Sequence, residues 1–165
     1  LFIMPLGADF GILAFSASTF NLPPPSMSNP SCYGRGIINK IRTMRTRGTA
    51  IVLRDNQVLL VRDLGKKNYS LPGGGANRNE PALAAAVREL KEELGMSAYK
   101  AERLFKCDFD GSFSRHKVSL IETNDSPRLN SNELEEYIWW DLKKPIPRYS
   151  HVDAILETFL EIDKT

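Results

Sequence analysis

Glutamate is concentrated in one short segment, Arg88 to Gly95, which carries it at positions 89, 92 and 93. If the segment is helical, Glu89 and Glu93 lie one turn apart and Glu92 lies three residues from Glu89, so the carboxylates share one flank. Like charges at these spacings destabilise a helix, and its C-terminal end disfavours anions. Arg88, four residues before Glu92, can neutralise only part of this charge. A divalent ion that prefers oxygen ligands, such as Mg²⁺, can neutralise the rest.

A simpler interpretation of the acidic segment needs no ligand. The glutamates would then form a solvated helix face, with Arg88 in a surface ion pair. The glycine run 73–75 favours a ligand site instead, because glycines between a strand and a helix let the backbone turn tightly and approach a bound group closely. Such turns are common, so the informative feature is the fixed interval between the glycines and the acidic segment.

The composition excludes several classes of protein. The 165 residues are 42% hydrophobic and 25% charged, which permits a packed core, and the net charge of +2 is too small for a dedicated nucleic-acid binder. Two cysteines, Cys32 and Cys107, cannot build a disulfide framework. Two isolated histidines, His116 and His151, leave little scope for a zinc site, and we assign neither a catalytic role. Metal chemistry would therefore depend on carboxylates, which favours Mg²⁺ or Mn²⁺.

Residues 1–43 differ in composition from the rest of the chain, with one acidic and three basic residues. The apolar stretch Leu1 to Phe20 is interrupted by Pro5 and Asp9 and is too short to span a membrane, which takes roughly 20 apolar residues. It also lacks the basic start of a signal peptide. We therefore expect a weakly structured extension over 1–43 and one domain over 44–165. A cleaved targeting segment, or upstream sequence that is not native to the protein, is the alternative.

The segments around the glycine run predict the elements that position the glutamates. Residues 49–53 and 57–62 predict two strands joined by a turn at Asp55-Asn56, which is the pattern of a hairpin. A helix is expected over 79–94, with Asn79 as its N-cap, Pro81 in its first turn and Gly95 at its end. Its core-facing stripe comprises Leu83, Val87, Leu90 and Leu94.

The remainder of the chain predicts further strands and a closing helix. Strands are expected over 103–109, 117–122 and 136–140. An amphipathic helix follows, marked by Val152, Ile155, Leu156, Phe159 and Leu160. Strands on both sides of one helix, with a second helix at the end, predict an α/β fold in which an α/β/α sandwich surrounds a mixed β-sheet.

The spacing from Gly74 to Met96 resembles the Nudix box. Gly74 is followed after five residues by Glu80 and after seven more by Arg88-Glu89-Leu90-Lys91-Glu92-Glu93-Leu94-Gly95-Met96. With apolar residues required at 90 and 96, the segment agrees with the box at nine defined positions over 23 residues. The resemblance is looser over about 45–163, and it does not extend to 1–43.

The resemblance implies a hydrolase that cleaves nucleoside diphosphates linked to another moiety, with Mg²⁺ or Mn²⁺ as cofactor. It implies that Glu89, Glu92 and Glu93 bind the metal, joined by the backbone carbonyl of Gly73. Arg88 would hold the glutamates in place and pair with Glu80, while Leu90 and Met96 would lock the helix to the sheet. Water would attack one phosphorus of the pyrophosphate without a covalent enzyme intermediate, helped by metal ions that screen its charge.

Several residues outside the box are candidates for the same site. Glu133 and Glu136 precede a strand with tryptophan and are candidates for the general base, with solvated loop acids as the alternative. Arg62, Lys66 and Lys67 are candidates for binding phosphate, with an exposed basic patch as the alternative. Tyr69 is expected to pack beside the site. Of Trp139 and Trp140, one is expected in the core and the other stacked on a nucleobase of the substrate. The alternative is that both are in the core.

The sequence leaves the substrate open. Gly111-Ser112-Phe113 follows the box where some Nudix subfamilies carry a characteristic proline or tyrosine, and this chain has neither. A Nudix-fold module that binds a nucleotide without turnover is one alternative, although such modules usually lose box acids. A hydrolase of RNA 5′ triphosphate ends is another, and the neutral domain argues mildly against it. We expect a cytoplasmic monomer or homodimer that acts on a small nucleotide-type substrate, has no membrane partner and meets nucleic acid only as an RNA 5′ end.

Overall fold

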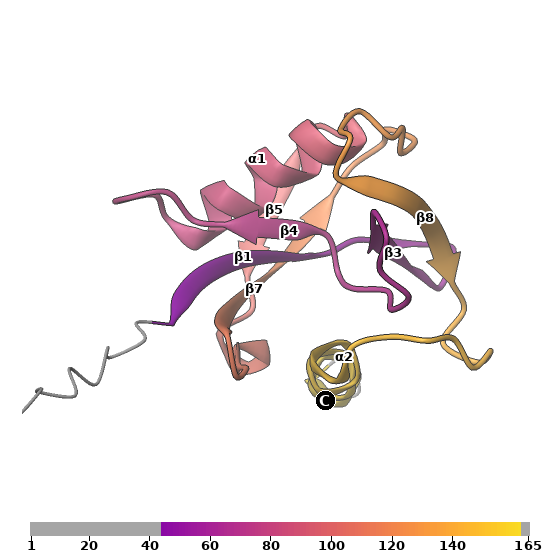
Figure 1. The fold of residues 1–165 in the computed structure, drawn as a ribbon. Coiled ribbons are helices and arrows are strands. Elements are labelled where there is room, and N and C mark those ends of the chain that lie inside the picture. The colour runs from indigo at the N-terminus through magenta and orange to yellow at the C-terminus, as the bar shows by residue number, and fades with distance from the viewer. Residues whose placement is uncertain (1–43, 163–165) are drawn as a thin grey trace, which may run out of the picture. The chain divides into compact units, whose positions relative to one another are not determined.

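The computed structural model describes residues 44–162. Two helices and eight strands follow one another along this part of the chain (Figure 1). Their bounds are β1 Arg45–Ile51, β2 Leu53–Arg54, β3 Gln57–Asp63, β4 Gly73–Gly75, α1 Ala82–Leu94, β5 Lys100–Arg103, the 3₁₀ turn η1 Phe105–Cys107, β6 Phe109–Asp110, β7 Ser114–Glu122, β8 Leu134–Trp140 and α2 Ser150–Ile162.

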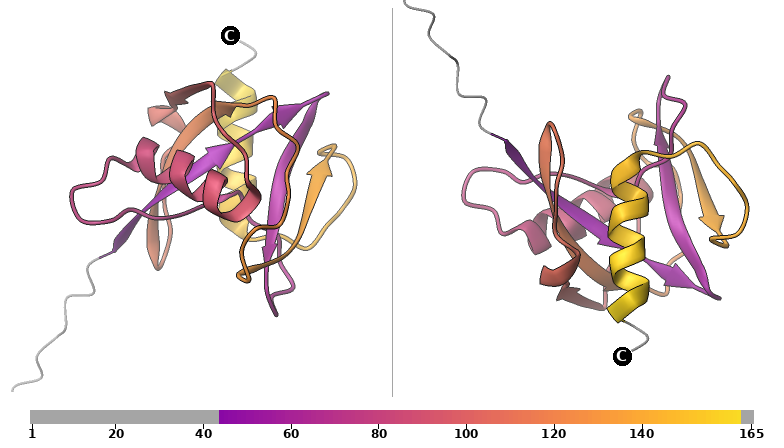
Figure 2. Two further views of the ribbon diagram at one scale, coloured as in Figure 1. Left: turned by 90° about the horizontal axis from the view of Figure 1, so that it is seen from above. Right: turned by 90° about the horizontal axis from the view of Figure 1, so that it is seen from below.

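The strands form two sheets between the two helices, as the views from above and below also show (Figure 2). The larger sheet has the order β4-β1-β7-β5, with β6 also paired to β7. Its β1–β7 pair is parallel and its other pairs are antiparallel, so the sheet is mixed. The smaller sheet has the order β2-β3-β8. The predicted α/β class with a mixed sheet is confirmed, and the finding beyond it is that the strands are divided between two sheets.

Alternating side chains of the strands supply two cores. Ala50, Val52, Leu59 and Val61 pack with α1, while Ile51, Val58 and Leu60 pack with α2. This is the alternation expected of strands that are covered on both faces. The largest side chains of α1 in its core are Leu90 and Leu94, with no exposed surface. The predicted stripe is thus fully buried only at the C-terminal end of the helix, next to the glutamates.

The predicted hairpin is confirmed at its turn. Leu53 pairs with Val58 and Arg54 with Gln57 across Asp55-Asn56. Both turn residues have positive φ, 50° and 60°, as expected for a type I′ turn. The first predicted strand nevertheless divides, because β1 belongs to the larger sheet and β2 to the smaller one.

The predicted start of the first helix is wrong and its predicted end is correct. Helix α1 begins at Ala82 with Pro81 as N-cap, and Asn79 lies outside it with a φ of 64°. A turn precedes the helix, in which the Glu80 carboxylate accepts the Asn77 amide N–H at 2.7 Å. At the other end Gly95 has a φ of 66° and its N–H bonds to carbonyls of the last turn.

The strand predicted over 103–109 is interrupted. Strand β5 ends at Arg103, η1 follows, and β6 covers only Phe109 and Asp110. The break has a local cause, because the Asp108 carboxylate accepts the Val118 N–H at 3.0 Å and bonds to Arg103 at 2.9 Å. The predicted closing helix is confirmed as α2, with Val152, Ile155 and Leu156 buried.

Within the described residues, no helix is long and apolar enough to cross a membrane. The expectations for residues 1–43 lie outside this range.

Candidate active site

Arg88 binds most of the acidic side chains of the α1 region. Its guanidinium donates to Glu80 at 2.8 and 3.1 Å, to Glu89 at 2.8 Å and to Glu92 at 2.9 Å. It also donates to the Gly75 carbonyl at 3.1 Å. The hydrogen bonds from Arg88, together with that from the Asn77 backbone N–H, lower the pKa of Glu80 to about 2, and the bonds to the glutamates raise the pKa of Arg88. Arg88 therefore ties the glycine run to α1 and compensates two of the three clustered glutamates.

Glu93 is the glutamate of the cluster that Arg88 does not reach. The residue is 8% exposed, and among the described residues its Oε2 atom has no hydrogen-bond partner. Burial raises its pKa to about 7 against the opposing effect of the Arg47 charge, and the nearby Glu89, Asp63 and Glu133 act in the same direction as burial. Leaving a buried carboxyl oxygen unpaired is costly, so this atom is suited to a ligand.

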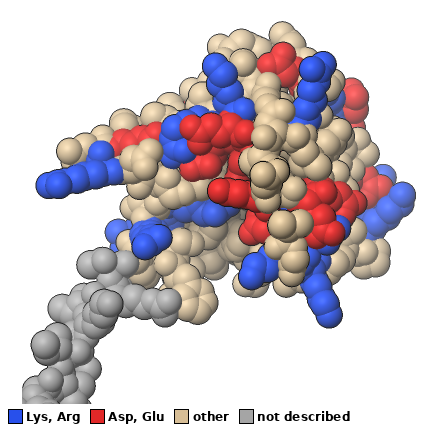
Figure 3. Space-filling model, turned by 45° about the horizontal axis from the view of Figure 1, so that its top comes forward, with Lys and Arg blue, Asp and Glu red and all other residues tan. Residues whose placement is uncertain are grey.

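Glu93 faces a cavity of about 440 Å³ that is lined mainly by acids and glycines. The face drawn in Figure 3 shows acidic side chains gathered together with basic ones around them. Arg47 enters the cavity from β1 and donates a hydrogen bond to the Gly73 carbonyl. The lining comprises Arg47, Asp63, Gly73–Gly75, Glu89, Glu93 and Glu133.

The oxygen donors around this cavity fit a hard divalent cation. The Glu93 carboxyl, the Glu89 carboxylate and the Gly73 carbonyl are the donor types that Mg²⁺ and Mn²⁺ prefer. Glu92 does not line the cavity, because its side chain is 59% exposed and paired with Arg88. Over residues 44–162, no group of three or more His, Cys, Asp or Glu side chains converges as a metal site. The donor chemistry is thus present, but the predicted set of three glutamates is not drawn together.

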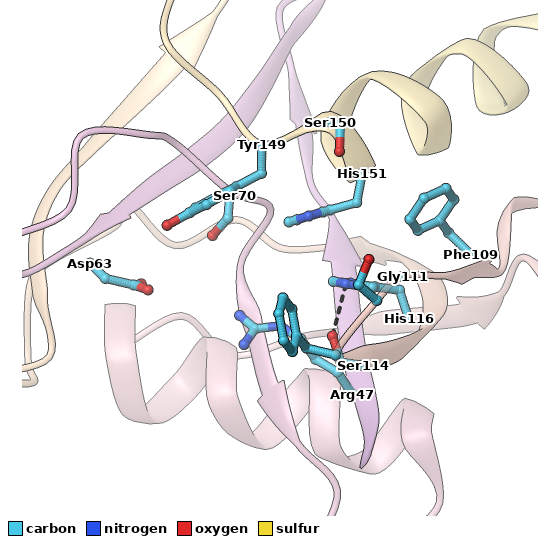
Figure 4. A pocket seen from close by; sticks show the side chains of 12 residues that line it. Arg47, Asp63, Ser70, Phe109, Gly111, Ser114, His116, Tyr149, Ser150 and His151 are labelled. Atoms are coloured by element: carbon cyan, nitrogen blue, oxygen red, sulfur yellow. Dashed lines mark hydrogen bonds between the residues drawn. The ribbon is translucent and has the colours of Figure 1, made fainter. Parts of the chain in front are cut away.

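A second cavity of about 370 Å³ adjoins the first and shares Arg47 and Asp63 with it (Figure 4). Aromatic rings and small polar side chains line it. His116 and His151 stack with ring centroids 4.3 Å apart, and Tyr149 lies against His151 at 5.6 Å.

The two histidines are isolated in the sequence but in contact in the structure. The parallel pairing of β1 with β7 places His116 opposite Arg47, and α2 supplies His151. No local signal predicts the contact of the two histidines, because it joins β7 to α2 across about 35 residues of sequence. Arg47 was not predicted, because its place beside His116 depends on the parallel pairing of β1 with β7.

Both imidazoles are held in the neutral form. Burial lowers the pKa of His116 to about 4, assisted by His151 and Arg47, and it lowers that of His151 to about 4, again assisted by Arg47. Nδ1 of His116 lies 3.1 Å from the Thr49 hydroxyl oxygen, and its Nε2 lies 3.1 Å from the Ser114 hydroxyl oxygen. The ring stack therefore presents an uncharged surface beside the acidic cavity.

The candidate phosphate-binding residues outside the box do not line either cavity. Arg62 donates to Glu136 at 2.5 Å and to Glu135 at 2.9 Å. Lys66 and Lys67 are exposed in the following loop. The structure brings Glu133 to the acidic cavity, whereas Glu136 is held by Arg62.

The aromatic candidates pack mainly inside the fold. Tyr69 belongs to the core on the α2 side, and the Cζ atom of Arg62 lies over its ring, 5.7 Å from the ring centroid. Trp140 belongs to the same core. Trp139 packs on the α1 side, with the Arg54 guanidinium 4.9 Å from its ring. Neither tryptophan lines the two cavities.

The neutral histidines predict a loss of stability in mild acid. Above pH 6.5 each is neutral in the folded and unfolded chain, but between pH 6.5 and about 4 the unfolded chain takes up the proton first. The free energy of unfolding should therefore fall as the pH drops through this window, on the order of 3 kcal/mol for His116. Urea unfolding at several pH values should show a flatter profile for His116→Gln than for wild type. Parallel profiles would rule out the histidine as the cause.

Alanine should have different consequences at two glycines, mainly on stability at Gly48 and mainly on turnover at Gly74. A Cβ at Gly48 would lie 2.3 Å from the Ala82 carbonyl oxygen and 2.6 Å from the Ala86 nitrogen, both helix backbone. A Cβ at Gly74 would instead meet the flexible end of Glu89, 2.2 Å from Cδ. Gly48→Ala should therefore lower the free energy of unfolding by about 1–3 kcal/mol, since backbone must move. Gly74→Ala should cost less stability and lower kcat through displacement of Glu89.

Thermal melts and turnover of both glycine variants test this pair. A Gly74→Ala variant that loses as much stability as Gly48→Ala but keeps wild-type kcat would contradict the assignment.

The comparisons with known proteins match this architecture. The profile of the NUDIX domain matches residues 44–159. An RNA pyrophosphohydrolase of Ruthia magnifica is 29% identical over 122 residues, which span 60% of this chain and 68% of that protein. An 8-oxo-dGDP phosphatase of Danio rerio is 27% identical over 110 residues. The match covers 63% of this chain and 34% of that protein. The crystal structure of a MutT NUDIX hydrolase from Burkholderia pseudomallei, 25% identical, has a TM-score of 0.58 and covers 69% of this chain and 96% of its own.

Proposed function

The chain belongs to the Nudix hydrolase family, and from this we propose that it is a metal-dependent pyrophosphohydrolase of nucleoside diphosphates linked to another moiety. The observation that carries the proposal is the acidic cavity. There the buried Glu93 has an unpaired carboxyl oxygen among the described residues, and Glu89 and the Gly73 carbonyl lie around the same space.

Glu93, Glu89 and the Gly73 carbonyl would hold Mg²⁺ or Mn²⁺. Glu92 would join them on leaving its ion pair with Arg88, which is solvent-exposed and so weakly held. When bound, such an ion neutralises phosphate charge, orients and acidifies a water, and stabilises the departing phosphate. Arg88 would position the glutamates through its bonds to Glu80 and Glu89.

Glu133 would act as the general base for the attacking water. It lines the acidic cavity together with Glu89 and Glu93, and it is exposed, so it can exchange its proton with solvent. The reaction would be direct attack of water on one phosphorus of the pyrophosphate, releasing two phosphate-bearing products. The adjoining cavity, with its neutral rings, would take the part of the substrate beyond the phosphates.

An RNA 5′ end is the second candidate substrate. Relatives from Ruthia magnifica and Bartonella clarridgeiae are named RNA pyrophosphohydrolases, each 29% identical to this chain over their matched parts. The 5′ end of such an RNA carries the same kind of phosphoanhydride as a nucleotide.

A panel assay separates the candidates. Each substrate would be incubated with Mg²⁺ or Mn²⁺ and its phosphate-bearing products separated by anion-exchange chromatography, using nucleoside triphosphates, nucleotide sugars, dinucleoside polyphosphates and a short 5′-triphosphate RNA. We expect turnover of at least one class and its loss in excess EDTA. No turnover of any member, or full activity in EDTA, would overturn the proposed function.

A further inference from the structure

Arg47 lies where the two cavities meet. Over the described residues it is the only positively charged side chain that lines either cavity, and it lines both. In Figure 4 its guanidinium lies between Asp63 and the two stacked histidines. A substrate that extends from one cavity to the other must pass this side chain.

The Arg47 guanidinium is bound to a backbone oxygen that is also a proposed ligand of the divalent cation. It donates to the Gly73 carbonyl, which the pairing of β4 with β1 brings alongside Arg47, since Thr49 pairs with Gly73. The same carbonyl is a proposed ligand of the divalent cation. A guanidinium and a divalent ion at one oxygen repel each other strongly, because the site is partly buried and poorly screened.

We propose that Arg47 competes with the divalent cation for the Gly73 carbonyl and, once displaced, binds a phosphate of the substrate at the junction of the two cavities. This rests on the proposed function, because it concerns the cation and phosphate of that reaction. A guanidinium is suited to the second role, because its fork of N–H donors matches phosphate oxygens.

The competition couples the two ligands through one side chain. The cation frees Arg47 for the phosphate, and the phosphate draws Arg47 away from the carbonyl, so each ligand favours the other. Removing the charge at position 47 should therefore have effects of opposite sign. Cation binding without substrate should become tighter, while phosphate binding should become weaker.

The test compares Arg47→Gln with wild type and with Arg45→Gln. Arg45 is exposed two residues earlier on β1 and lines neither cavity, so its variant loses the same charge from the same strand. Mn²⁺ affinity would be measured without substrate by electron paramagnetic resonance of the free ion. Binding of methylenediphosphonate, a pyrophosphate analogue that resists hydrolysis, would be measured by calorimetry in excess Mn²⁺.

In Arg47→Gln we expect Mn²⁺ to bind severalfold more tightly and the analogue about tenfold more weakly. Arg45→Gln should change either constant by less than about twofold, because exposed charges are well screened. Unchanged or weaker Mn²⁺ binding in Arg47→Gln, or wild-type analogue binding, would overturn the proposal. If Arg47→Gln does not fold, Arg47→Met, which also removes the charge and keeps an unbranched side chain, should show the same two signs, and their absence would overturn the proposal equally.

These measurements need no turnover. A wild type that hydrolyses nothing in the panel would therefore defeat the proposed function, while the binding constants would still decide the role of Arg47.

Discussion

Glu93→Gln should lower kcat by about a hundredfold or more while leaving the chain folded. The substitution keeps the shape of the side chain and removes the ionisable carboxyl of a residue that is 8% exposed. Among the described residues its Oε2 has no hydrogen-bond partner, so the substitution breaks no hydrogen bond between that atom and this part of the chain. The damage should therefore fall on cation binding and catalysis rather than on stability. Turnover with saturating Mg²⁺, together with a thermal melt, measures both.

Glu135→Gln is the matched control for this substitution. Glu135 is exposed, bonds to Arg62 at 2.9 Å and lines neither cavity. The control should keep kcat within about twofold, since an exposed ion pair contributes little. A Glu93→Gln variant with the turnover of the control would remove Glu93 from the catalytic assignment.

Local features of the molecule could be predicted from the sequence. The Asp55-Asn56 turn and the end of α1 at Gly95 depend on residues that tolerate positive φ, and both occur where expected. The ion pair of Arg88 with Glu80 was expected from the resemblance to the Nudix box, and the two side chains meet at 2.8 Å. Such features depend on residues within about ten positions of one another.

Features that depend on strand pairing could not be predicted in the same way. Arg47 and His116 face each other only because β1 and β7 are parallel neighbours, a contact between segments separated by a helix and several strands. Arg62 looked available for phosphate in the sequence, but β8 pairs with β3 and brings Glu136 to it. A charge pattern along one segment cannot show which charge of another segment will oppose it.

Divalent cations should stabilise the fold by mass action. An ion that binds only the folded chain adds about 2.7 kcal/mol to the free energy of unfolding at one hundred times its dissociation constant, and about 4.1 kcal/mol at one thousand times. Mg²⁺ or Mn²⁺ should therefore raise the melting temperature of wild type. The rise should shrink in both Glu89→Gln and Glu93→Gln, which remove proposed ligands.

The two variants should differ when no cation is added. If relief of the repulsion among the three glutamates were the only effect, both variants would be at least as stable as wild type. The structure predicts different stabilities for the two variants. Glu89 accepts a hydrogen bond from Arg88 at 2.8 Å, whereas Oε2 of Glu93 has no hydrogen-bond partner among the described residues. Glu93→Gln should thus melt no lower than wild type in EDTA, and Glu89→Gln should melt slightly lower. Equal cation-induced shifts in wild type and both variants would place the ion elsewhere, because a side chain that binds the ion cannot lose its charge without weakening that binding.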